Sequence, residues 1–146
     1  MLTFKTSAET QVWAVKLASE MQRPCVVLLD GDVGAGKTQL VRWFCTALGV
    51  AGAMSPTFSI HQRYPAKSGP VDHADLYRLK DTADLESSGF WDLLLEPSGL
   101  LFVEWADRVS SDAWPRHWQR IHIHLFKGTD GDESRRVELE FKPPSS

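Results

Sequence analysis

The sequence predicts a single α/β domain with a mixed central β-sheet, flanking helices and a C-terminal β-hairpin. First, the apolar segment 26–29 has the composition of a strand buried on both faces, and a glycine-rich loop and a helical pattern follow it. Second, several further strand-like segments are separated by turn or helical segments. Third, no repeat or linker divides the 146 residues, so we expect residues 1–146 to form one domain.

The elements around the glycine-rich loop have clear local signals. Residues 2–5 alternate as in a strand. Thr6 and Glu9 have the spacing of a capping box, which predicts a helix over about residues 7–22. After the loop, apolar residues recur at helical spacing until Gly49, which suits a helix C-terminus.

The second half of the chain predicts the rest of the sheet. We expect strands at 57–64, 71–76 and 100–104, one or two short helices within 81–95, an irregular or short helical link at 109–118, and a hairpin from 120–127 and 134–142. The last four residues, 143–146, are expected to form a disordered tail.

The composition is that of an ordinary globular protein. Hydrophobic residues make up 42% and charged residues 24%, and the formal net charge is −3, which gives no basic field for autonomous nucleic-acid binding. No apolar run approaches a membrane span and the N-terminus lacks a signal-peptide pattern, so we expect a cytoplasmic protein. Cys25 and Cys45 lack metal-site spacing and are expected to be free buried thiols; a redox pair is a remote alternative.

Residues 31–38 match the complete phosphate-binding loop pattern G-x-x-x-x-G-K-[ST]. Glycines allow main-chain N–H groups to turn towards phosphate oxygens, and the following helix directs its positive N-terminal end at the anion. The lysine reaches the β- and γ-phosphates, and the threonine hydroxyl binds Mg²⁺. The candidate ligands are Gly31, Asp32, Val33, Gly34, Ala35, Gly36, Lys37 and Thr38. A dinucleotide fingerprint fails because Val33 or Gln39 stands where glycine is needed.

Two acidic residues follow predicted strands and are candidates for the metal site. Glu104 ends the apolar run 100–103, and Asp75 ends the segment that begins at Val71. In open α/β sheets, ligands bind at the carboxyl edge of the parallel strands. Glu104 could bind Mg²⁺ directly, bind it through water, or orient the attacking water, and Asp75 could share the site.

Three further features are less specific. Ser55-Pro56-Thr57-Phe58 lies where many phosphate-loop switches place a hydroxyl that senses the γ-phosphate. Trp105 is expected to alternate to the face opposite Glu104 and to serve packing rather than nucleotide stacking. His122 and His124 share one strand face; they could chelate a metal, although an exposed polar face is the more common explanation.

Together these segments resemble the TsaE family, the ATPases of bacterial tRNA threonylcarbamoyladenosine biosynthesis. The resemblance rests on the phosphate loop, then Ser55-Pro56-Thr57-Phe58, then His73-Ala74-Asp75-Leu76-Tyr77-Arg78-Leu79, then Val103-Glu104-Trp105, and it covers nearly the whole chain.

The resemblance implies specific residue roles. Thr38 and Glu104 correspond to the metal ligands, Asp75 to the active-site aspartate, and Lys37 is catalytic with both acids. Thr57 falls in the first switch segment. Ser7 and Thr10 correspond to the helix start near adenine, and Arg135 or Arg136 to a late basic residue near the nucleotide. Gln39 replaces a usual threonine and Ala74 a usual aromatic residue, but the N–H group of Gln39 remains available to phosphate.

The resemblance also implies Mg²⁺-dependent ATP hydrolysis that supports threonylcarbamoyl transfer to tRNA without performing it. A TsaD-like transferase and a TsaB-like paralogue would be the partners, with tRNA contacted only indirectly and no membrane involved. Two alternatives stay open: a small-molecule kinase, although no arginine-rich lid is apparent, and a nucleotide-gated binding module. A guanine-specific switch is disfavoured because the chain has no N-K-x-D motif.

Overall fold

The computed structural model describes residues 1–50, 60–77, 79, 82–129 and 131–145. These residues form a seven-stranded sheet in the order β1-β7-β6-β2-β5-β4-β3. The strands are β1 Leu2–Phe4, β2 Cys25–Asp30, β3 His61–Tyr64, β4 Val71–Asp75, β5 Leu100–Glu104, β6 Gln119–Lys127 and β7 Arg135–Lys142. β6, β2, β5 and β4 run parallel, and β1, β7 and β3 pair antiparallel with their neighbours. The predicted mixed α/β fold is confirmed.

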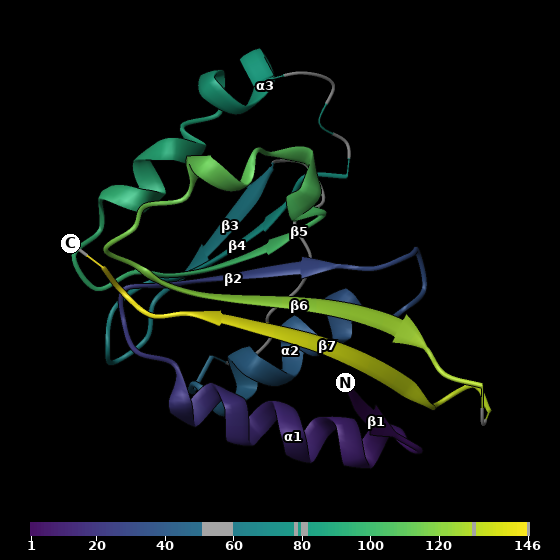
Figure 1. The fold of residues 1–146 in the computed structure, drawn as a ribbon. Coiled ribbons are helices and arrows are strands. Elements are labelled where there is room, and N and C mark those ends of the chain that lie inside the picture. The colour runs from purple at the N-terminus through teal and green to yellow at the C-terminus, as the bar shows by residue number, and fades with distance from the viewer. Residues whose placement is uncertain (51–59, 78, 80–81, 130, 146) are drawn as a thin grey trace.

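Helices cover both faces of the sheet (Figure 1). α1 (Ser7–Glu20) and α2 (Lys37–Ala47) lie on one face, and α3 (Thr82–Ser87) lies on the other. The described part of the chain also contains three short 3₁₀ helices: η1 Phe90–Leu95, η2 Ala106–Arg108 and η3 Ser111–Ala113. The predicted capping box is present. Thr6 Oγ1 accepts a hydrogen bond from the Glu9 N–H, and Glu9 Oε2 accepts one from the Thr6 N–H.

Strand alternation divides the core between the two faces. Val27 and Leu29 of β2 belong to the cluster under α1 and α2, where Phe44 stacks on Phe102 at a centroid distance of 5.4 Å. Val26 and Leu28 of the same strand belong to the cluster beneath the 3₁₀ helices. Complete burial of β2 on both faces explains its uninterrupted apolar sequence.

The structure also describes the two cysteines and part of the C-terminal segment. Cys25 and Cys45 are free and buried, and burial raises their thiol pKa values to about 12 and about 11. In the segment expected to be a tail, the Ser145 N–H donates to the carbonyl oxygen of Arg116 at 2.8 Å. Within the described residues, the helices are too short or too polar to cross a membrane.

Candidate functional site

The loop between β2 and α2 requires glycine at three positions. Gly34 and Gly36 have φ angles of 84° and 106°, in the left-handed region that other residues rarely adopt. Gly31 has a φ of 153°, and a Cβ atom there would lie 2.4 Å from the carbonyl oxygen of Leu125 on β6. A side chain at Gly31 would therefore push the loop away from its neighbouring strand.

Lys37 is buried at the first turn of α2 and its ammonium group lies inside the loop. Nζ donates to the carbonyl oxygens of Gly31 at 2.5 Å and Asp32 at 3.0 Å. It also lies 4.2 Å from the centroid of the Trp105 ring, a cation–π contact. Burial lowers the pKa of Lys37, while the negative charge of Glu104 is the strongest opposing influence.

Glu104 ends β5 beside the first turn of α2 and is only 2% exposed. Its Oε1 accepts a hydrogen bond from Thr38 Oγ1 at 2.8 Å, and its Oε2 lies 2.5 Å from His73 Nε2. In octahedral Mg²⁺ coordination with bonds of about 2.0–2.1 Å, adjacent ligand oxygens lie about 2.9 Å apart. The spacing of the Thr38 and Glu104 oxygens therefore fits two adjacent ligands of one such ion.

Asp75 ends β4 next to Glu104, its register partner across the parallel β4–β5 pair. Its carboxylate is half-buried and accepts from the Tyr77 N–H at 3.0 Å. Burial is the largest influence and raises the pKa of Asp75; the Tyr77 hydrogen bond lowers it, and the charge of Glu104 adds to the rise.

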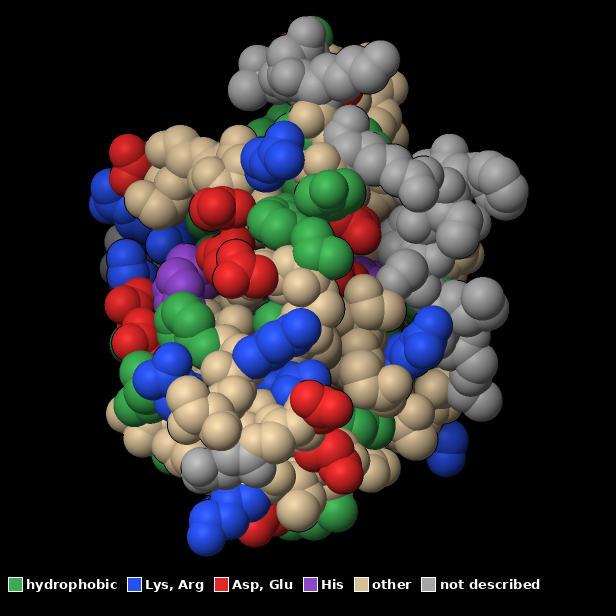
Figure 2. Space-filling model, turned by 90° about the vertical axis from the view of Figure 1, so that its right-hand side faces the viewer, with side chains coloured by type: hydrophobic (Ala, Val, Ile, Leu, Met, Phe, Trp, Pro, Cys, Tyr) green, Lys and Arg blue, Asp and Glu red, His purple; other side chains and the backbone are tan. Residues whose placement is uncertain are grey.

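These side chains line one cavity of about 290 Å³, so the structure brings the predicted catalytic and metal-binding residues together. This cavity is at the carboxyl end of the parallel strands, the end viewed in Figure 2, where Lys and Arg side chains lie between groups of acidic ones. The lining residues are Val33, Gly34, Gly36, Lys37, Thr38, Gln39, Asp75, Tyr77, Glu104 and Trp105.

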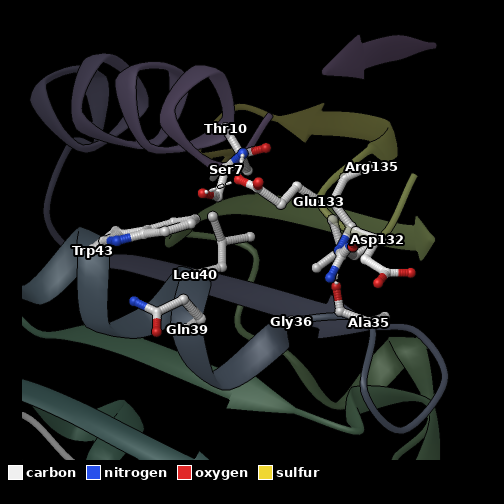
Figure 3. Close-up of a pocket in the computed structure, with 11 residues that line it drawn as sticks. Ser7, Thr10, Ala35, Gly36, Gln39, Leu40, Trp43, Asp132, Glu133 and Arg135 are labelled. Carbon is white, nitrogen blue, oxygen red and sulfur yellow. Dashed lines mark hydrogen bonds between the residues drawn. The ribbon is translucent and has the colours of Figure 1, made fainter. Parts of the chain in front are cut away.

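A second cavity of about 270 Å³ lies on the other side of Gly36 and Gln39, between α1, α2 and the β6–β7 hairpin (Figure 3). It is lined by Ser7, Thr10, Ala35, Gly36, Gln39, Leu40, Trp43, Leu125, Asp132, Glu133 and Arg135. The resemblance placed Ser7 and Thr10 near adenine and Arg135 near the nucleotide, and all three residues are among them.

Hydrogen bonds join the hairpin to both walls of this second cavity. Ser7 Oγ donates to Glu133 Oε1 at 2.7 Å, and Arg135 Nε donates to the carbonyl oxygen of Ala35 at 2.7 Å. Arg136, the alternative to Arg135, instead lies against the Phe126 ring, which is 5.8 Å away, and does not line the cavity.

Two sequence interpretations need comment. Trp105 does not continue the strand alternation: its φ is 60°, in the left-handed region, and its ring lines the cavity beneath Lys37. The expectation that it faces away from Glu104 is wrong because β5 ends at Glu104 and the chain turns there. The predicted switch residue Thr57 lies outside the described residues.

Sequence reasoning missed four residues of these cavities and their surroundings. His73 precedes Asp75 by two positions on β4, so alternation places it on the same face; that spacing was a usable signal. Trp43 lies one helical turn beyond Gln39, which was also a usable signal. Asp132 and Glu133 reach their cavity through the turn of the hairpin, for which local sequence holds no signal.

Comparison with known proteins identifies the protein family. The family model described as "Threonylcarbamoyl adenosine biosynthesis protein TsaE" matches residues 4–137. The chain belongs to the TsaE family.

Several proteins of the TsaE family have similar sequences or structures. A Synechocystis protein named tRNA threonylcarbamoyladenosine biosynthesis protein TsaE is 38% identical over 104 residues, which cover 68% of this chain and 66% of that protein. Its namesake from Haemophilus influenzae is 34% identical over 126 residues, covering 86% and 75%. The crystal structure of Bacillus subtilis YdiB matches with a TM-score of 0.72 at 25% identity, covering 99% of this chain and 84% of that one. The chain spans less than two thirds of the Synechocystis relative and 62% of the one from Rickettsia conorii.

Two of the departures from the TsaE pattern, Gln39 and Ala74, have clear locations. Gln39 borders both cavities. Ala74 is fully buried among the apolar residues on the face opposite α2, where it packs with Leu76 and Val103.

Proposed function

We propose that this chain is a Mg²⁺-dependent ATPase that supports tRNA N⁶-threonylcarbamoyladenosine modification and does not itself transfer the group. The observation that carries the proposal is the 2.8 Å contact between Thr38 Oγ1 and Glu104 Oε1, at the end of a glycine-rich loop that also holds a buried lysine. The family and the printed names of its relatives support the link to this modification.

Each part of the loop has a role in holding the triphosphate. The positive φ angles of Gly34 and Gly36 let main-chain N–H groups turn inwards, and the N-terminus of α2 adds a favourable dipole. Lys37 would exchange the carbonyl oxygens of Gly31 and Asp32 for phosphate oxygens. In this proposal the loop binds the anion chiefly through its backbone N–H groups.

Thr38 and Glu104 would hold Mg²⁺, which neutralises negative charge on the phosphate oxygens when bound. His73, at 2.5 Å from Glu104 Oε2, fixes the orientation of that carboxylate. Asp75 lines the same cavity, its Oδ1 accepts from the Tyr77 N–H, and we assign its carboxylate the role of orienting a water molecule. The ring of Trp105 shields the lysine from bulk solvent.

The second cavity is the candidate site for the adenine ring. It is continuous with the phosphate loop through Gly36 and Gln39, and Trp43 and Leu40 give it apolar surface. Ser7, Thr10 and Arg135 supply polar groups around that surface. ATP would then lie from α1 across the loop to Glu104.

A partner-dependent activity suits this site. Among the described residues that line the cavity at Lys37 and Glu104 there is no arginine, and phosphate-loop enzymes commonly gain 10³–10⁵-fold from an arginine supplied in cis or in trans. We further propose that residues 1–146 act as one domain in the cytoplasm. They would be slow alone and stimulated by a TsaD-like transferase with its TsaB-like paralogue, reaching tRNA only through that complex.

The test is ATP hydrolysis with and without the purified transferase pair. We expect stimulation by the pair, with ADP and phosphate as products. Turnover driven by a small metabolite that becomes phosphorylated would instead identify a kinase. Nucleotide binding without turnover in the presence of the pair would identify a binding module.

A further inference from the structure

A second group of metal-binding side chains lies outside the proposed ATP site. Asp30 is the last residue of β2, and His122 and His124 are two positions apart on the neighbouring strand β6. In the parallel β2–β6 register, Asp30 is the partner of His124 and Leu28 that of His122, so all three side chains share one face. One ligand atom from each lies within 4.8 Å of the others.

The three side chains are already in contact. His122 Nε2 lies 2.5 Å from Asp30 Oδ2, and the two imidazole rings stack at a centroid distance of 4.2 Å. An ordinary aspartate–histidine hydrogen bond accounts for His122. It does not account for a second imidazole placed against the first.

The cluster is held rigidly yet is accessible to an ion. The Asp107 N–H donates to Asp30 Oδ1 at 3.1 Å, which leaves Oδ2 directed at His122. Such fixing of a ligand by an outer hydrogen bond is typical of metal sites. The Asp30 side chain is 11% exposed and that of His122 is 25% exposed, so both are partly buried but remain accessible to solvent.

The surrounding charge favours a cation. On β7, Glu140 is the register partner of His122, and Glu138 that of His124. Direct antiparallel partners project to the same face, so the two glutamates border the cluster. Figure 2 shows histidine beside acidic side chains on this end of the molecule.

We propose that Asp30, His122 and His124 form a Zn²⁺ site with water as the fourth ligand. Two imidazoles and one carboxylate are a donor set that zinc accepts in open tetrahedral sites. Ligand atoms in such a site lie about 3.3 Å apart when the bonds are about 2.0–2.1 Å. In the proposed site, small side-chain rotations would bring the three ligand atoms to this distance from one another. The metal ion would then take the place of the direct Asp30–His122 contact.

This site shares no ligand with the proposed Mg²⁺ site. Alternation along β2 puts Asp30 with Val26 and Leu28, on the face opposite the cluster that packs under α2. Glu104, in contrast, contacts Thr38 of α2. The ion would join β2 to β6 directly before Gly31, the first residue of the phosphate loop.

The experiment is titration of the nucleotide-free protein with Co²⁺, followed by visible absorption, and with Zn²⁺, followed by calorimetry. We expect one tetrahedral Co²⁺ per chain, displaced by Zn²⁺. His124→Ala should weaken Zn²⁺ affinity by more than about 100-fold, because the loss of an outer-shell partner alone costs 10–100-fold. His117→Ala is the matched control, since His117 is exposed and outside the cluster, and should leave affinity unchanged.

Two further variants make the result decisive. Glu104→Gln should keep the Co²⁺ signal, because the tetrahedral site does not use Glu104. His124→Gln repeats the test if His124→Ala fails to fold by circular dichroism. The proposal is overturned if the wild type gives no tetrahedral Co²⁺ spectrum, or if both folded His124 variants bind Zn²⁺ as tightly as the wild type.

Discussion

Replacement of Glu104 by glutamine tests the metal site with little disturbance of the fold. Glutamine keeps an oxygen to accept from Thr38 Oγ1, and its amide group faces His73 Nε2, which a neutral imidazole can present as an acceptor. The residue is 2% exposed, so an isosteric change avoids the cavity that alanine would leave. What the substitution removes is the negative charge on the ion's ligand.

We expect turnover to fall by about 100-fold or more, which equals about 2.7 kcal/mol of transition-state stabilisation at 1.36 kcal/mol per tenfold. Loss of one positioned electrostatic group in other enzymes costs 10²–10³-fold. Nucleotide affinity without Mg²⁺ should change by less than about threefold, because Lys37 and the main-chain N–H groups are retained.

The assay measures ADP formation in the presence of the transferase pair, alongside binding of a fluorescent nucleotide. Glu20→Gln, at the exposed end of α1, is the charge-matched control and should keep both properties. Hydrolysis by Glu104→Gln at the wild-type rate would refute the assignment of Glu104 to the ion.

Three other predictions concern the buried ionisable groups. Lys37→Ala should weaken ATP binding by at least about tenfold in calorimetry, because it removes a buried ammonium from the phosphate loop; unchanged affinity would contradict that role. Burial raises the pKa of Asp75 above 3.8, so its ionised form destabilises the fold as pH rises through the folded pKa. Asp75→Asn should therefore raise the melting temperature at pH 7, and this gain should vanish below about pH 3.8. Equal melting temperatures of the variant and the wild type at all pH values would refute this prediction. Cys25 and Cys45, with thiol pKa values raised to about 12 and about 11, should not react with a disulfide reagent at pH 8 until guanidinium unfolds the chain.

The local parts of the fold were predictable from sequence because short-range physics determines them. The capping box at Thr6 and the apolar β2 both act within a few residues. The position of Glu104 followed from the apolar run 100–103 that precedes it, and that of Asp75 from the end of the strand-like segment that begins at Val71.

The remaining features depend on contacts between distant segments. Local periodicity does not say that β6 inserts beside β2, which is what brings His122 to Asp30 and Leu125 against Gly31. Trp105 escaped prediction because a left-handed backbone is rare outside glycine and has no periodic signal.

The placement of β2 in the sheet has a consequence for synthesis. Both of its neighbours, β5 and β6, lie more than sixty residues downstream in the sequence. Arg135 on β7 also donates a hydrogen bond to the loop at the carbonyl oxygen of Ala35. A nascent chain therefore carries its glycine-rich segment through most of translation without the strands that shape it. A fragment released before residue 135 lacks the contact of Arg135 with Ala35, and we expect it to bind nucleotide more weakly than the intact chain.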